Sequence, residues 1–202
     1  RGLPAVVMVF EPQPKEYFSR LFGKDLPPRL SPLRDKMRLI SKIHPHIKGV
    51  NVRRFNSEFA AIAAQSFIDE VLIAQLNVKY LLIGDDFCFG AKRQGNFALL
   101  QQQTAFVTEN TSSLMVENTR ASSTVIREAL GRGDLDLAER LLGHPYVLSG
   151  HVKHGAKLGR TLGCPTANVH LPPLMFPLSG VYVVEVMGSF GKRRGVARFG
   201  LN

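Results

Sequence analysis

Residues 80–86 of the 202-residue chain read Tyr80-Leu81-Leu82-Ile83-Gly84-Asp85-Asp86. A short, continuous apolar run of this kind is typical of a strand buried on both faces, as in a parallel sheet. A second apolar run lies at residues 5–10, and residues 50–55 have the pattern of another strand. Ligands of parallel sheets bind beyond the carboxyl ends of the strands. We therefore expect the acidic pair and the segment Phe10-Glu11-Pro12 to lie at such ends.

Helical patterns separate these apolar runs. The strongest has apolar residues on one side over residues 59–76, which predicts a single amphipathic helix. Residues 31–43 predict another helix, with Ser31-Pro32 at its start. Further segments predict helices at 97–103, 122–131 and 134–142 and short strands at 104–107 and 114–116. Strands that alternate with helices at this spacing indicate an α/β fold, with a parallel sheet and flanking helices.

The sequence pattern changes near Pro145. Helical periodicity disappears, and strand-like segments separated by Gly and Pro follow at residues 146–154, 169–171, 181–186 and 195–199. We predict an α/β domain over residues 1–143 and an all-β domain, a small barrel, over residues 144–202. About four strands would leave an open sheet edge, so we expect this domain to continue beyond Asn202.

The composition indicates a soluble globular protein of the cytoplasm. Apolar residues make up 45% and charged residues 21% of the chain. No apolar stretch approaches the roughly 18–20 residues that span a bilayer, so no membrane partner is expected. Cys88 and Cys164 lie far apart, which argues against a disulfide scaffold or a zinc site and favours a reducing compartment. The chain does not begin with Met, which suggests that it starts partway into a larger protein.

The formal net charge of +10 is unevenly distributed. Up to Gly143 there are 19 Lys and Arg against 15 Asp and Glu, and from His144 onward there are 7 against 1. Such an excess serves either nucleic acid or phosphorylated small molecules. The basic residues are scattered except for Lys192-Arg193-Arg194, and no aromatic residues alternate with them to stack bases. Small molecules are favoured, and no nucleic-acid partner is expected.

The segment from Arg120 to Arg127 places Ser122, Ser123 and Thr124 at the start of a predicted helix. The unpaired N–H groups and the dipole of a helix start attract phosphate. Arg120 and Arg127 would add charge-assisted hydrogen bonds to phosphate oxygens. The alternative is that the hydroxyl residues only cap the helix and Arg127 is a solvated surface residue.

A second motif, Gly84 to Gly95, follows the predicted third strand. Its carboxylates, Asp85 and Asp86, would hold a ligand hydroxyl or amine. Phe87 and Phe89 would pack either against a planar ring or in the core. A metal pair is disfavoured because no third acidic residue or His lies nearby.

A third motif, Gly150 to Asn168, brings glycines into a basic segment between two predicted strands. Glycines allow the backbone to approach phosphates closely, although the segment is not a Walker A sequence. On a strand, Thr166 and Asn168 would share one face, and their oxygen atoms suit Mg²⁺ bound together with phosphate. The alternative is an ordinary polar turn. The six His residues are scattered without metal-ligand spacing.

These motifs resemble those of a known family. Residues 150–168, which include Pro165-Thr166-Ala167-Asn168, resemble the riboflavin kinase signature. Residues 10–14, 84–90 and 122–127 resemble, in that order, motifs of FMN adenylyltransferases. From about Val6 to Asn202, the chain thus resembles the bacterial bifunctional riboflavin kinase/FMN adenylyltransferases, also called FAD synthetases.

The resemblance implies a Rossmann-like nucleotidyltransferase domain followed by a partial riboflavin-kinase barrel. It implies ATP-dependent phosphorylation of riboflavin to FMN and adenylylation of FMN to FAD, with Mg²⁺. The residues implied to bind ATP phosphates are Arg120, Ser123, Thr124 and Arg127 in one domain and Gly155, Lys157, Gly159 and Arg160 in the other. The residues implied to bind flavin are Phe10, Pro12, Pro14, Asp86 and Phe87. Thr166 and Asn168 are implied to hold the metal.

The chain also departs from the family pattern. The family's Gly-x-Phe-Asp-Gly-x-His-x-Gly-His segment would precede Val6, and the kinase's catalytic Glu would follow Asn202. Gln13 stands where His is common, and Cys164 stands where Phe is common. The resemblance therefore implies a fragment lacking both ends, with unknown catalytic residues and little activity of its own. A nucleotidyltransferase of another pathway and a non-catalytic anion- or RNA-binding module stay open as alternatives, and the sequence does not determine an oligomeric state.

Overall fold

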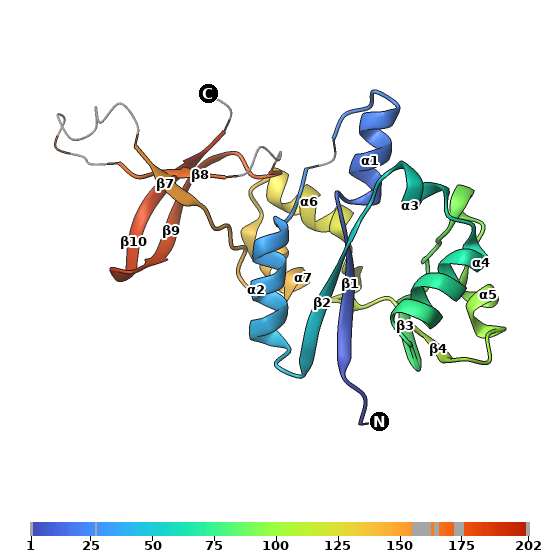
Figure 1. The fold of residues 1–202 in the computed structure, drawn as a ribbon. Coiled ribbons are helices and arrows are strands. Elements are labelled where there is room, and N and C mark those ends of the chain that lie inside the picture. Colours follow the sequence, from blue (N-terminus) through green and yellow to red (C-terminus); the bar gives the residue numbers. More distant parts are fainter. Residues whose placement is uncertain (1, 27, 155–162, 164–165, 172–175, 201–202) are drawn as a thin grey trace. The chain divides into compact units, whose positions relative to one another are not determined.

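The computed structural model of the protein describes residues 2–26, 28–154, 163, 166–171 and 176–200. The chain forms two compact units that interleave along the sequence. Unit 1 combines Arg1–Ala5, Leu26–Lys48 and Ala121–Asn202, and unit 2 combines Val6–Asp25 and Gly49–Arg120. Figure 1 shows the elements coloured in chain order. Each unit is therefore built from segments that lie far apart in the sequence.

Unit 2 mixes helices with short strands. Its elements are β1 (Ala5–Glu11), α1 (Pro14–Leu21), β2 (Ile47–Arg54), α3 (Ser57–Ala61), α4 (Ala64–Ser66), a π-helix (Phe67–Gln75), β3 (Tyr80–Gly84), a 3-10 turn (Ala91–Arg93), α5 (Phe97–Gln101), β4 (Val107–Thr111), β5 (Met115–Val116) and β6 (Thr119–Arg120). β1 pairs with β2, and β5 pairs antiparallel with β6. β3 pairs with β4 in parallel, with Tyr80 opposite Val107 and Gly84 opposite Thr111. The α/β composition and the parallel pair agree with the sequence prediction.

The core of unit 2 is built from α4, the π-helix, β3, α5 and the loops that follow β3 and α5. Ile68 of the π-helix and Leu100 of α5 are 0% exposed. Full burial of side chains of this size stabilises a fold by about 1.5–3 kcal/mol each. The buried cluster consists of Ala64, Phe67, Ile68, Val71, Leu72, Ile83, Phe89, Leu100 and Phe106.

The prediction of one continuous helix over residues 59–76 is wrong. α3 ends at Ala61, the backbone at Ile62 and Ala63 is extended, and the helix resumes at Ala64. The break has a tertiary cause, because the carbonyl of Ile62 accepts a hydrogen bond from the Ala91 amide at 2.7 Å instead of one within a helix. Apolar periodicity did not reveal the break, since both residues at the break are themselves apolar.

Three strand predictions also need correction. β3 is buried on one face only: Ile83 is 9% exposed, whereas Leu82 on the opposite face is 57% exposed. In β1, Val6 is 55% exposed, so this strand is not buried on both faces either. The strand predicted at 104–107 is β4, which begins at Val107, where the amide binds the Lys79 carbonyl at 3.1 Å and pairing with β3 starts.

Unit 1 contains three helices among the described residues: α2 (Leu33–Ile43), α6 (Ser123–Gly131) and α7 (Leu135–Leu142). α6 and α7 pack together, and Ala129, Leu130 and Ala138 are 0% exposed. Local chemistry sets their ends. Ser122 and Asp134 cap the two helices through their side-chain oxygens, and Gly143 ends α7 in a left-handed conformation with φ of 73°.

The strands of unit 1 form antiparallel pairs. β7 (His151–Lys153) pairs with β8 (Asn168–His170), and β9 (Gly180–Gly188) pairs with β10 (Gly191–Phe199). The strand predicted over 146–154 is thus reduced to its last part, because Ser149 makes its backbone hydrogen bonds with side chains of α2. Among the described residues of both units, every helix is too short or too polar to cross a bilayer.

Candidate functional site

The acidic turn, Gly84-Asp85-Asp86, lies at the carboxyl end of β3, where Gly84 is opposite Thr111 of β4. The Asp85 carboxylate accepts hydrogen bonds from the Ser113 hydroxyl at 3.1 Å and from Nη2 of Arg120 at 3.3 Å. Arg120 and Asp85 are both about half-exposed, so the pair is accessible to a ligand. Asp86, the predicted flavin contact, is exposed. The structure thus joins a predicted phosphate ligand, Arg120, to the predicted acidic site.

A chain of aromatic rings links the two predicted flavin-binding segments within unit 2. Phe10 contacts Phe59 with ring centroids 5.6 Å apart, and Phe59 contacts Phe67 at 6.0 Å. Phe67 contacts Phe89 at 5.3 Å, and Phe89 stacks on Phe87 at 5.7 Å. Phe89 is 7% exposed and belongs to the core. Phe10 and Phe87, the first and last rings of this aromatic row, are half-buried. Of the two phenylalanines after the acidic turn, Phe87 is therefore the one with ring surface left for a ligand.

The other predicted flavin residues lie where β1 leads into α1. Pro12 follows a cis peptide bond, and Pro14 is the first residue of α1. The Gln13 amide donates to the Glu16 carboxylate at 3.2 Å, so Glu16 closes a capping box at the start of the helix. Pro12 and Pro14 are half-buried, as is Phe10. The capping box thus holds the start of α1, and part of each of these three side chains stays accessible.

The predicted phosphate site lies at the start of α6. Ser122 is the cap and accepts a hydrogen bond from the Val125 amide at 3.3 Å, while Ser123 and Thr124 are exposed. Arg127 is not a solvated surface residue: its Nε donates to the Pro28 carbonyl at 2.6 Å, and its Nη1 donates to the Ser123 carbonyl at 3.1 Å. Arg127 therefore ties the first turn of α6 to the segment that leads into α2.

The proposed metal ligands lie at the start of β8. Asn168 is the first residue of the strand and pairs with Lys153 of β7. Thr166 precedes the strand, so the expectation that both residues belong to one strand is wrong. Both residues are exposed, and a hydroxyl and an amide oxygen suit Mg²⁺ together with phosphate oxygens. The described residues include no cluster of three His, Cys, Asp or Glu for a metal ion. Gly155, Lys157, Gly159 and Arg160 lie outside the described residues.

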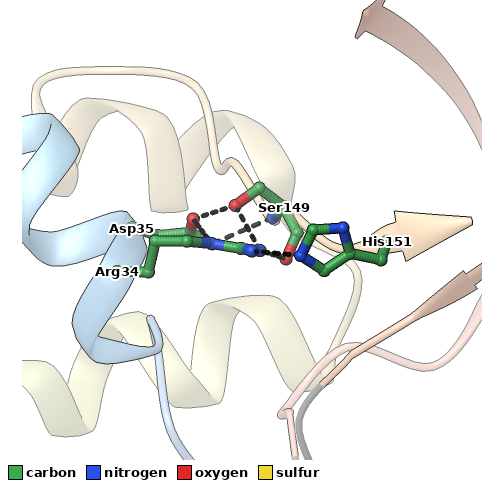
Figure 2. A network of polar contacts seen from close by, with 4 residues as sticks. All are labelled: Arg34, Asp35, Ser149 and His151. Atoms are coloured by element: carbon green, nitrogen blue, oxygen red, sulfur yellow. Dashed lines mark hydrogen bonds and ion pairs between the residues drawn. The ribbon is translucent and has the colours of Figure 1, made fainter.

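Sequence reasoning missed a polar network around Ser149 in unit 1 (Figure 2). Arg34 and Asp35 of α2 both contact Ser149, and Arg34 also lies 3.4 Å from Nε2 of His151. Tyr146 lies nearby, and burial together with the Asp35 charge raises the pKa of its hydroxyl. More than a hundred residues separate the partners in sequence, and no pattern in the sequence connects them.

Comparison with known proteins gives a consistent assignment. The family model for FAD synthetase matches residues 1–125, and the model for riboflavin kinase matches residues 142–202. Proteins named bifunctional riboflavin kinase/FMN adenylyltransferase are similar to this chain: that of Haemophilus influenzae is 48% identical over 98% of the chain, and that of Escherichia coli K12 is 47% identical over 99%. The chain spans 64% of the length of each.

A solved structure shares the fold. It is described as a macrolide-efflux protein from Streptococcus pneumoniae, and it matches 98% of this chain and 64% of its own length with a TM-score of 0.79 and 30% identity. The sequence matches and the family models agree with the order of the motifs along the chain. The FAD synthetase model matches more than half of the residues, so the chain belongs to the FAD synthetase family.

Proposed function

We propose that the protein carrying this chain is a transferase that makes flavin cofactors at the expense of ATP. One reaction transfers a phosphoryl group from ATP to riboflavin and gives FMN. The other transfers AMP from ATP to FMN, which gives FAD and releases pyrophosphate. The names of the relatives and the two family matches support both reactions. Macrolide efflux, named for the solved structure, is not proposed, because the motifs of this chain resemble those of flavin enzymes.

We propose that two consecutive parts of the sequence carry out the two reactions. Residues 1–143 form the FMN adenylyltransferase domain, with a Rossmann-like arrangement that the parallel β3–β4 pair supports. Residues 144–202 belong to the riboflavin kinase domain, a barrel to which the two antiparallel pairs β7–β8 and β9–β10 would contribute. The two widely separated cysteines favour the cytoplasm as the compartment. Riboflavin, FMN and ATP are the proposed partners, without nucleic acid or a membrane.

The proposed FMN adenylyltransferase activity rests mainly on the row of aromatic rings from Phe10 to Phe87, which ends next to the acidic turn. A flavin ring is planar and aromatic, and offset stacking on half-buried Phe87 or Phe10 would bury its apolar faces. Asp86, exposed at the end of β3, would accept hydrogen bonds from the same ligand. The start of α6, with Ser123 and Thr124, would bind ATP phosphates through free amides and hydroxyls.

The kinase half rests on the β7–β8 pair. Asn168 and Thr166 would hold Mg²⁺ and ATP phosphates, with the segment from Gly155 to Arg160 close to the nucleotide. Bound there, Mg²⁺ would neutralise negative charge on the phosphate oxygens. The chain's own contribution would be two oxygen ligands, of which Asn168 lies on a strand paired with β7.

A flavin titration tests the proposed function. We expect FMN fluorescence to be quenched in a saturable way as the full-length protein is added, because stacking on an aromatic side chain quenches the flavin ring. The Phe87→Leu variant should bind FMN more weakly, while Phe190→Leu, which changes an exposed ring of the β9–β10 connection, should bind normally. Salt-dependent RNA binding without any effect on flavin fluorescence would instead indicate an RNA-binding module.

Arg127→Ala in the full-length protein is expected to slow conversion of FMN to FAD about tenfold or more, since charge-assisted hydrogen bonds to phosphate are strong. Riboflavin phosphorylation should change less than twofold. Separate assays of FMN and FAD formation measure the two rates. Arg132→Ala, at the end of the same helix, is the control. An unchanged rate of FAD formation would show that Arg127 serves only to hold the Pro28 carbonyl.

A further inference from the structure

Two adjacent residues of α2 hold Ser149, which lies just before β7 (Figure 2). The Asp35 carboxylate accepts hydrogen bonds from the Ser149 amide at 2.9 Å and from the Ser149 hydroxyl. Nη2 of Arg34 donates to the Ser149 carbonyl at 2.7 Å and to the hydroxyl oxygen at 3.0 Å. Every polar group of Ser149 is thus bound by α2. We call Arg34, Asp35, Ser149 and His151 the α2 latch.

Burial of the Asp35 carboxylate makes it costly to release Ser149 from α2. Asp35 is only 3% exposed, and a buried carboxylate is costly unless hydrogen bonds and nearby positive charge compensate for the lost water. The two donors of Ser149 and the Arg34 guanidinium, whose Nε lies 3.8 Å away, supply that compensation. Asp35 also sits in the first turn of α2, where the helix dipole favours a negative charge. Movement of Ser149 away from α2 would deprive the carboxylate of the Ser149 amide and hydroxyl.

The latch acts on the strand pair that carries Asn168. Gly150 follows Ser149 and approaches β8 so closely that a Cβ atom there would lie 2.5 Å from the His170 carbonyl oxygen. His151 then begins β7 opposite His170, which places Lys153 opposite Asn168. Only Gly150 and the first two paired residues of β7 separate Ser149, which binds the buried Asp35, from the position opposite Asn168. The start of β7 is therefore held by α2 on one side and by β8 on the other.

We propose that Arg34 and Asp35 are positioning residues for riboflavin phosphorylation, which act by fixing β7 and thereby Asn168 of β8. This inference rests on the proposed kinase function. It assigns a role in the kinase reaction to residues that lie within the segment matched by the FAD synthetase model rather than the riboflavin kinase model. Neither residue touches substrate; both act through Ser149.

The test compares Asp35→Asn with unsubstituted full-length protein. The new amide nitrogen cannot accept the hydrogen bonds that one carboxylate oxygen accepts now, so Ser149 should be released. We expect hydrogen exchange at the Ser149 amide to speed up at least about tenfold. The kcat for riboflavin phosphorylation should fall about tenfold through misplacement of Asn168, whereas the KM for riboflavin and the rate of FAD formation from FMN should stay within twofold.

Two further variants serve as a partial disruption of the latch and as a control. Ser149→Ala removes only the hydroxyl and should give the same pattern in a weaker form. Asp136→Asn, an exposed acid in the first turn of α7, is the matched control and should change nothing. A parallel fall in both activities together with stability would make the latch purely structural, and normal kinetics despite faster exchange would refute the positioning role. A lack of riboflavin phosphorylation by the unsubstituted protein would contradict the proposed function itself, while the exchange measurement would still test the latch.

Discussion

Replacement of Asn168 by Ala in the full-length protein is expected to lower riboflavin phosphorylation about a hundredfold or more, because phosphoryl transfer depends on exact positioning of the metal and phosphates. Asn168 is exposed and its backbone is already paired with Lys153, so the substitution removes the proposed ligand atom without disturbing the strand. FAD formation from added FMN should be unaffected, since that reaction is proposed to use the other domain. The two rates are measured separately on the same preparation.

The control for Asn168 is His170→Ala, which removes another exposed polar side chain two residues along β8. It should retain both activities. Asn168→Asp keeps an oxygen ligand and should retain more phosphorylation than the Ala variant. Equal loss of both reactions in Asn168→Ala would refute the assignment of two separate sites.

Gly90→Ala should produce a large loss of stability in unit 2. Gly90 has φ of 72°, and a Cβ atom there would lie 2.6 Å from Cα of Ala64 and 2.7 Å from its nitrogen. The left-handed backbone and the overlap with another backbone segment together predict a cost of about 2–5 kcal/mol. Urea unfolding of the variant, with its midpoint compared with that of the parent, measures this cost.

Gly23→Ala separates the two causes. Gly23 has a similar φ of 60°, but a Cβ atom there would meet nothing within 4 Å. Only the backbone preference remains, so the expected cost is about 1–2 kcal/mol. If the two variants unfolded at the same urea concentration, the contact between Gly90 and Ala64 would contribute nothing to stability.

The sequence predicted those elements whose ends depend on nearby residues. The helices α6 and α7 begin where Ser122 and Asp134 cap them, and α7 ends at left-handed Gly143. In contrast, the break at Ile62 depends on the Ala91 amide, which lies far along the chain. One-sided burial of β3 also escaped prediction, because an apolar run has the same composition whether one or both of its faces are covered.

In the candidate site, too, local features were predicted and contacts between distant residues were not. The acidic turn and the start of α6 were predicted because strand ends and helix starts are local features with known chemistry. The bonds from Arg127 to the Pro28 carbonyl and from Asp35 to Ser149 join residues about a hundred positions apart. Such pairs leave no period or motif in one sequence, so only the folded chain reveals them.

The ion pair between Asp85 and Arg120 has a consequence for any anion that approaches the acidic turn. Arg120 already has a carboxylate partner 3.3 Å away before a ligand arrives. Binding at its guanidinium through Nη2 is therefore an exchange of one anion for another, and its free energy is the difference between two attractions. A singly charged anion gains little from that exchange, whereas a multiply charged phosphate gains more. We therefore expect the pair with Asp85 to make Arg120 bind multiply charged phosphates in preference to singly charged anions of the solvent.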